Sequence, residues 1–247
     1  MKRQVVLTVA ESKRLIAKGV AASTVVKKAM KDGIVVIAAG TTNAYVLEEL
    51  WGRRIDKRRY RMGITAPDKP EKLDEPPKDR IPDVVFRKGV VDSNLTRLSA
   101  PKEMGKDDVY IKGANALDYR RRMAGILIGN PTGGTIGAAL GHIVGKTINL
   151  IIPIGLEKLV YEDITTLYRL VSEEDDEGPS LWPITGTIIT EIEAVKILTG
   201  VHATLLAAGG VAGAEGAVRL LLDGPDDAVE HTITLIESIK DEPRFLL

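Results

Sequence analysis

Residues 33–50 read GIVVIAAGTTNAYVLEEL. The apolar run at 34–39 predicts a buried strand, and residues 42–50 have the spacing of a helix. Between them lies a turn of small residues, Gly40, Thr41, Thr42 and Asn43. The first N–H groups of such a helix have no partner within it, and the helix dipole adds partial positive charge. Because phosphates and carboxylates bind readily at this kind of turn, the stretch predicts an α/β sheet and an anionic ligand.

The alternation of strand and helix continues on both sides of this stretch. Residues 8–32 have helical spacing, interrupted at Gly19 and ended by Gly33, and from residue 108 onward apolar strands return. The predicted elements there are strands at 109–111, 124–129 and 148–153 and a helix at 134–144. Strands that are apolar throughout and alternate with helices indicate a parallel sheet covered by helices.

Residues 52–107 differ in character, with many arginines and prolines. Residues 83–91 predict a hairpin that turns at Lys88-Gly89, and residues 62–66 a short strand. The basic run at 53–59 is interpreted as a solvated face. The alternative is a rim that steers an anionic ligand toward the sheet.

An acidic segment at 172–179, SEEDDEGP, is typical of a domain boundary. The elements predicted after it are a strand at 186–190, a helix at 191–199, strands at 201–208 and 217–222, and a helix at 225–239. That order is the ferredoxin-like split unit, whose last strand residues 243–247 could supply. We therefore predict an open, mostly parallel Rossmann-like domain at 1–175 and a small ferredoxin-like α+β domain at 180–247.

Composition narrows the class of protein. The chain has 247 residues, 44% of them hydrophobic, and no cysteine, so a packed core is expected and thiolate chemistry is excluded. A net charge of zero, from 34 basic and 34 acidic residues, argues against direct nucleic-acid binding. No apolar run approaches the ~20 residues of a membrane span. We expect a cytoplasmic homo-oligomer, with a charge content compatible with a thermophile.

A second turn, at residues 130–135, reads NPTGGT and also joins a predicted strand to a helix. In an open parallel sheet both turns lie at the carboxyl edge, where ligands bind. Lys112 directly follows the strand at 109–111, and its ammonium can hold a phosphate or carboxylate. The predicted ligand-binding residues are Gly40, Thr41, Thr42, Asn43, Lys112, Gly113, Asn115, Asn130, Thr132, Gly133, Gly134 and Thr135.

Candidate catalytic groups are few: Lys112, Asp118 and Glu157. Each has a structural alternative, because Lys112 can be an exposed lysine beside a turn, Asp118 can form an Asx turn with Asn115, and Glu157 can lie on the surface. The three histidines are scattered in sequence, so neither a metal site nor a cofactor is expected. The glycine-rich stretch 209–216 is either a flexible hairpin or a lid or inter-subunit contact.

Four segments, 33–46, 108–118, 124–137 and 151–160, resemble the signature segments of ribose-5-phosphate isomerase. The resemblance covers about residues 8–160. It implies the ribose-5-phosphate isomerase/CoA transferase-like superfamily, which also contains glucosamine-phosphate deaminases, formyltetrahydrofolate cyclo-ligases and ligand-sensing repressors. In that family the first turn is a phosphate loop, and a small ferredoxin-like domain is present.

The departures from the family pattern fall on its catalytic residues. Lys112 and Asn115 stand where the family has aspartates, the loop at 129–137 lacks its lysine, and its glutamate has no counterpart. We therefore expect no ribose-5-phosphate isomerase activity. Two hypotheses remain. One is a protein that binds a sugar phosphate, nucleotide or acyl-CoA, and the other is an isomerase, transferase or hydrolase with non-standard catalytic residues.

Overall fold

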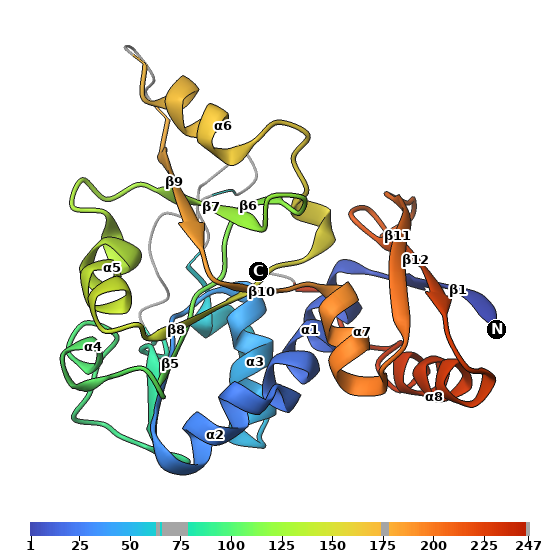
Figure 1. Cartoon of the computed structure of the whole chain (residues 1–247), viewed down its shortest axis with the longest axis horizontal. Helices are drawn as coiled ribbons and strands as arrows, with labels where there is room; N and C mark the ends of the chain where they lie inside the picture. Colours follow the sequence, from blue (N-terminus) through green and yellow to red (C-terminus); the bar gives the residue numbers. More distant parts are fainter. Residues whose placement is uncertain (63–64, 66–78, 174–177, 246–247) are drawn as a thin grey trace.

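The computed structural model of the chain describes residues 1–62, 65, 79–173 and 178–245. Three sheets and their helices form a mixed α/β protein whose largest sheet contains parallel strands (Figure 1). None of the helices in that part of the chain combines the length and the apolar character needed to cross a bilayer.

The central sheet has the strand order β10-β8-β5-β2-β3-β4. Its strands are β2 (Ile34–Ile37), β3 (Val84–Arg87), β4 (Val90–Val91), β5 (Val109–Ile111), β8 (Asn149–Pro153) and β10 (Thr187–Ile189). The strands from β10 to β2 are parallel, and β3 and β4 add an antiparallel hairpin at one edge. The hairpin turns at Lys88 and Gly89, both with positive φ, as the sequence predicts.

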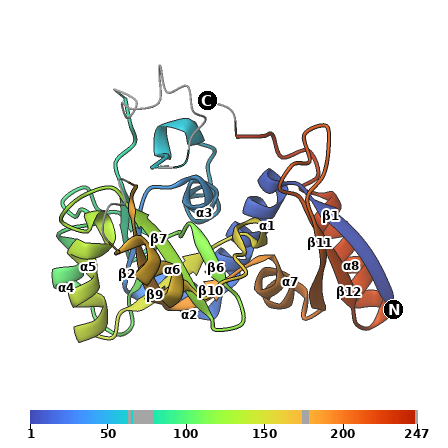
Figure 2. The ribbon, with the colours of Figure 1, turned by 90° about the horizontal axis from the view of Figure 1, so that it is seen from above.

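Helices cover both faces of this sheet. In the chain, α1 (Val9–Ala22) and α2 (Thr24–Asp32) precede β2, and α3 (Thr41–Trp51) follows it. Figure 2 shows α1 and α3 on one side of the sheet and α4 (Ala100–Glu103) and α5 (Gly134–Gly145) on the other. The predicted helices at 42–50 and 134–144 are confirmed within a residue.

A second sheet is antiparallel, with the order β6-β7-β9. It consists of β6 (Ala116–Asp118), β7 (Met123–Ile128) and β9 (Ser180–Thr185), with α6 (Ile164–Val171) packed on it. The strand predicted at 124–129 is therefore real but not part of the parallel sheet. Its apolar run suits either sheet, because only its partners distinguish them. The short strand predicted at 62–66 lies mostly outside the described residues, and Met62 is not in a strand.

The third sheet has the order β1-β12-β11 and carries α8 (Asp226–Glu237). Its strands are β1 (Lys2–Leu7), β11 (His202–Ala208) and β12 (Val218–Asp223). The antiparallel hairpin of β11 and β12 and the helices α7 (Glu191–Thr199) and α8 are as predicted. Residues 243–245 are not in a strand, and 246–247 are not described. β1 pairs with β12 on the side opposite β11, which is the place expected for the strand predicted at 186–190.

Three strands thus pair across the boundary predicted at 175–180, since β9 also pairs with β7. β10 extends the central sheet because Thr187–Ile189 pairs in parallel with Ile151–Pro153, and β1 belongs to the small sheet. Buried side chains of the two sheets also join in one hydrophobic cluster, which includes Val36, Ile151, Leu220 and Val229. The acidic segment itself is only partly described, since 174–177 lie outside the described residues.

Helix α1 connects the two halves of that cluster. A capping box between Thr8 and Glu11 starts the helix, which runs through Gly19 without the predicted interruption. A Cβ on Gly19 would lie 2.6 Å from Cβ of Ala194 on α7. Gly19 is therefore a point of close helix contact and not a helix breaker.

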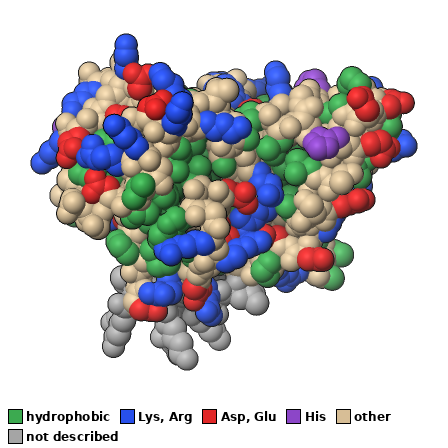
Figure 3. All heavy atoms as spheres, turned by 90° about the horizontal axis from the view of Figure 1, so that it is seen from below, with side chains coloured by type: hydrophobic (Ala, Val, Ile, Leu, Met, Phe, Trp, Pro, Cys, Tyr) green, Lys and Arg blue, Asp and Glu red, His purple; other side chains and the backbone are tan. Residues whose placement is uncertain are grey.

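Charge is mixed on the molecular surface. On the face in Figure 3, basic and acidic side chains are interspersed around apolar areas and form no continuous field of one sign. This pattern accords with the zero net charge of the sequence.

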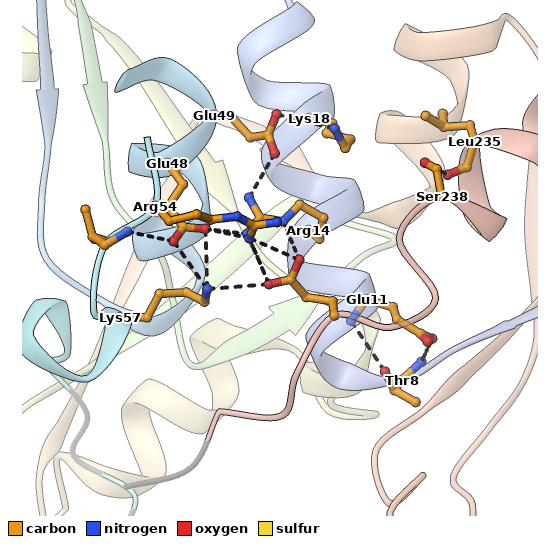
Figure 4. Close-up of polar contacts among 12 residues, drawn as sticks. Thr8, Glu11, Arg14, Lys18, Glu48, Glu49, Arg54, Lys57, Leu235 and Ser238 are labelled. Atoms are coloured by element: carbon orange, nitrogen blue, oxygen red, sulfur yellow. Dashed lines mark hydrogen bonds and ion pairs between the residues drawn. The ribbon is translucent and has the colours of Figure 1, made fainter. Parts of the chain in front are cut away.

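A buried ion-pair network ties the end of the described chain to α1 and α3. Figure 4 shows the Arg14 guanidinium at its centre, with Glu48 and Glu49 of α3 and Lys57 around it. Nε of Arg14 donates to Glu242 at 2.8 Å, and one terminal nitrogen donates to Glu49 at 2.8 Å. The carboxylates of Glu48 and Glu242 are as buried as Arg14. These three charges are therefore stabilised by their ion-pair partners and not by water.

Candidate functional site

The parallel strands bring four chain segments to one edge of the central sheet. These segments follow β2, β5, β8 and β10 and consist of residues 38–43, 112–115, 154–158 and 190–191. Since parallel strands end at the same edge, the side chains of these segments are the ones that a ligand at the edge would meet.

A cavity of about 270 Å³ opens at this edge. Its lining combines the end of β2, the start of the segment after β5, the end of β7 and the first turn of α5. The residues are Ala39, Met62, Lys112, Ile126, Leu127, Ile128, Gly129, Asn130, Gly133, Gly134, Thr135 and Ile136. The walls are therefore mostly apolar, with one cationic side chain and a loop of exposed backbone.

The first predicted turn is held rigidly beside this cavity. The Gly40 N–H donates to the Tyr60 carbonyl at 2.9 Å, and the Asn43 amide donates to the carbonyls of Ala38 at 2.6 Å and Ile111 at 3.3 Å. Asn43 is buried and joins α3 to the ends of β2 and β5. None of Gly40, Thr41, Thr42 or Asn43 lines the cavity, which Ala39 reaches instead.

The second turn forms one wall of the cavity although its strand belongs to another sheet. Asn130 holds it, since its side-chain oxygen accepts from the Thr132 N–H at 2.9 Å and its carbonyl accepts from the Gly133 N–H at 2.9 Å. Gly133 and Gly134 have φ of 80° and 56°, which glycine tolerates best. The turn thus leads into α5 with its backbone open to the cavity, while Thr132 serves only to hold the turn.

Lys112 reaches the cavity from the end of β5. Its backbone N–H donates to the Ile151 carbonyl at 3.0 Å, and its Nζ donates to the Gly113 carbonyl at 3.3 Å. No carboxylate of the described residues lies within ion-pair distance of this ammonium. Burial, and next the positive charge of Lys158, lower the pKa of Lys112 to about 8, while Asp83 opposes the shift.

A cluster of buried charges lies next to Lys112 along the same edge. Lys158 donates to the Ala114 carbonyl at 2.9 Å, and Lys13 of α1 lies 3.6 Å from Glu157. Burial is the main cause that lowers the pKa of Lys158. Glu157 folds back over Gly155, where a Cβ would overlap its carboxylate.

Glu191 completes this cluster at the start of α7. It is fully buried, and its carboxylate accepts from the Leu156 N–H at 3.0 Å. Burial, and next the neighbouring charge of Glu157, raise the pKa of Glu191 to about 7. Within the described residues, Glu157 and Glu191 each have one buried carboxylate oxygen that makes no hydrogen bond of standard geometry.

The other predicted site residues lie away from the cavity. Asn115 is exposed, and its side-chain oxygen accepts from the Leu127 N–H at 3.0 Å, which joins the start of β6 to the end of β7. Asp118 pairs with Arg121 at 3.0 Å and lines a separate cleft of about 1080 Å³. A Cβ on Gly113 would lie 3.7 Å from the Pro153 carbonyl, which is an ordinary van der Waals contact, so nothing at this position requires glycine.

Sequence reasoning missed Lys13, Lys158 and Glu191. An acid at the first position of a helix is ordinarily explained by the helix dipole, and a lysine on an amphipathic helix by solvation. Only the convergence of β8, β10 and α1 brings these side chains together. Of the three, only Glu191 directly follows a predicted strand, at 186–190, and this position is its signal in the sequence.

No protein-family model, curated protein or solved structure matches the chain. Within the described residues there is no group of three or more His, Asp or Glu side chains arranged to hold a metal ion. The assignment of a function therefore rests on the geometry of this edge.

Proposed function

We propose that the chain binds a phosphorylated or otherwise anionic small molecule in the cavity beside Lys112. The observation that carries the proposal is a cationic side chain without an acidic partner in the described structure, facing a glycine turn at a helix start. The first N–H groups of α5, from Gly134 to Ile136, have no partner within the helix and add to the positive potential.

The size of the cavity favours a small metabolite. Ligand pockets commonly measure about 300–1,000 Å³, and the cavity here, about 270 Å³, lies just below that range. A sugar phosphate or a short carboxylic acid suits such a volume. A nucleotide or an acyl-CoA would place most of its atoms outside.

We further propose that the chain is a divergent member of the ribose-5-phosphate isomerase/CoA transferase-like superfamily. The parallel order β10-β8-β5-β2, with a turn and helix after β2, supports a Rossmann-like sheet of that kind. The hairpin of β11 and β12 with α7 and α8 supports the ferredoxin-like part, in which β1 would take the place of the first strand. The second hypothesis is that the same site is enzymatic. The lowered pKa of Lys112 favours it, because a neutral lysine can act as a nucleophile.

Thermal-shift screening followed by calorimetry tests the proposal. Sugar phosphates, nucleotides, folates and acyl-CoAs form the screening panel, and the best ligand is titrated into wild type and Lys112→Ala. A charge-assisted hydrogen bond contributes about 1.5–3 kcal/mol, so the variant should bind about tenfold to a hundredfold more weakly.

Two controls make the result specific. Lys106→Ala removes an exposed lysine from the same part of the chain and should leave the affinity unchanged. Lys112→Arg keeps a positive charge and should retain most of the affinity. Equal affinities of wild type and Lys112→Ala would refute the site.

A further inference from the structure

We infer that Lys112 is a nucleophilic lysine that forms an imine with the carbonyl group of the anion bound in the cavity. This inference rests on the proposed function, because the anionic end of the molecule is what the glycine turn would hold. It adds the substrate class, a small anion that carries an aldehyde or ketone.

The surroundings of Lys112 favour a neutral amine over an ammonium held in a permanent ion pair. Its Nζ contacts a backbone carbonyl, that of Gly113, at 3.3 Å, and no described carboxylate is close enough to neutralise it. Ile126, Ile128 and Ile136 supply apolar cavity walls. Such walls disfavour the charged form of a lysine and strengthen its nucleophilic form.

A second lysine acts in the same direction. Lys158 is held near Lys112 by its bond to the Ala114 carbonyl at 2.9 Å, and the positive charge of Lys158 adds to the effect of burial on Lys112. A pKa of about 8 leaves about a quarter of Lys112 neutral at pH 7.5, against about 0.1% of an ordinary lysine.

The chemical step needs no further reactant. The Nζ lone pair adds to the carbonyl carbon, the C=O electron pair moves to oxygen, and proton transfer from nitrogen gives a carbinolamine. The carbinolamine hydroxyl then takes up a proton from solvent and leaves as water, while the nitrogen lone pair forms the C=N bond of a protonated imine. The protonated imine keeps one positive charge, so the attraction for the anionic end of the substrate at the start of α5 is preserved.

Reductive trapping tests this step. The full-length protein is incubated with glyoxylate and cyanoborohydride at pH 7.5, and peptide mapping measures the rate of Nε-carboxymethylation at each lysine. Lys112 should react at least about tenfold faster than the exposed Lys102 and Lys106 of the same molecule. A rate at Lys112 equal to theirs would overturn the inference.

The pH profile supplies a measurement that needs no variant. The trapping rate of Lys112 should rise to half of its plateau near pH 8, whereas a rate that still climbs toward pH 10 would contradict the inference. Lys112→Arg keeps the charge and should give no adduct at position 112.

Inorganic phosphate separates this inference from the proposed function. If phosphate binds wild type but Lys112 is not trapped selectively, the cavity binds anions and the imine is wrong. If Lys112 is trapped selectively but phosphate neither binds nor slows the trapping, the anion site is wrong. Protection of Lys112 by phosphate supports both.

Discussion

Glu191 is the first residue of α7 and is separated from the end of β10 by Thr190 alone. It is fully buried beside Glu157, with Lys13 and Lys158 as the nearest cations of the cluster. In the unfolded chain it ionises near pH 4.5, whereas in the folded protein it does so near pH 7. The folded state therefore binds more protons between these values, and stability contributed by the neutral form is lost as pH rises through 7.

Replacing Glu191 with glutamine should remove this pH dependence. The amide oxygen can still accept from the Leu156 N–H, but the side chain no longer ionises. Between pH 4.5 and 8, urea unfolding should show wild type losing about 3 kcal/mol relative to Glu191→Gln. The exposed Glu237→Gln serves as the control and should follow wild type. A constant difference between Glu191→Gln and wild type would show that burial does not hold this acid neutral.

Arg14 and Arg54 belong to the same ion-pair network but differ in burial. Arg14→Ala leaves Glu48 and Glu242 buried without their main partner and should lower the free energy of unfolding by about 3–5 kcal/mol. Arg54 is 70% exposed, so Arg54→Ala should cost about 1 kcal/mol or less. Denaturant titrations of the two variants make the comparison, and similar losses would contradict it.

Helices and strands with strong local signals are the elements that the sequence predicts well. β2, α3, α5 and α8 follow from apolar runs and helical spacing, with Gly52 and Gly133 at helix ends. β1 and β9 are missed because polar residues or a proline interrupt their apolar pattern. Only the pairing with neighbouring strands makes these segments strands. Likewise, β7 belongs to the second sheet because it pairs with β6 and β9. Consequently the two turns of the site are predictable, whereas the charge cluster beside them is not.

The contact between α1 and α7 leaves no room for a side chain at Gly19. Alanine has the higher helix propensity, but at Gly19 its Cβ would lie 2.6 Å from that of Ala194. Gly19→Ala should therefore destabilise the protein by about 1–3 kcal/mol. Gly141 in α5 has nothing within 4 Å of its added Cβ, and Gly141→Ala should stabilise by about 0.5–1 kcal/mol. Thermal unfolding of the pair checks the opposite signs.

Considered as a whole, the molecule joins its sheets through one hydrophobic cluster and through α1. β10 and β1 each connect a segment to the sheet on the other side of the predicted boundary. We expect the chain to unfold in one cooperative transition, with calorimetric and van't Hoff enthalpies equal. Two resolved calorimetric peaks would contradict this and favour two independent domains at 1–175 and 180–247.

The pairing of β1 with β12 also determines the order of events during protein synthesis. The Met1 amino group bonds to the Gly224 carbonyl, 223 positions along the chain. At an elongation rate of about 5–20 residues per second, the two strands leave the ribosome on the order of 10–45 s apart. Through that interval β1 lacks its native strand partner. Lys2, Arg3 and Gln4 stay exposed in the finished protein, and these polar residues would discourage the nascent strand from pairing with other chains.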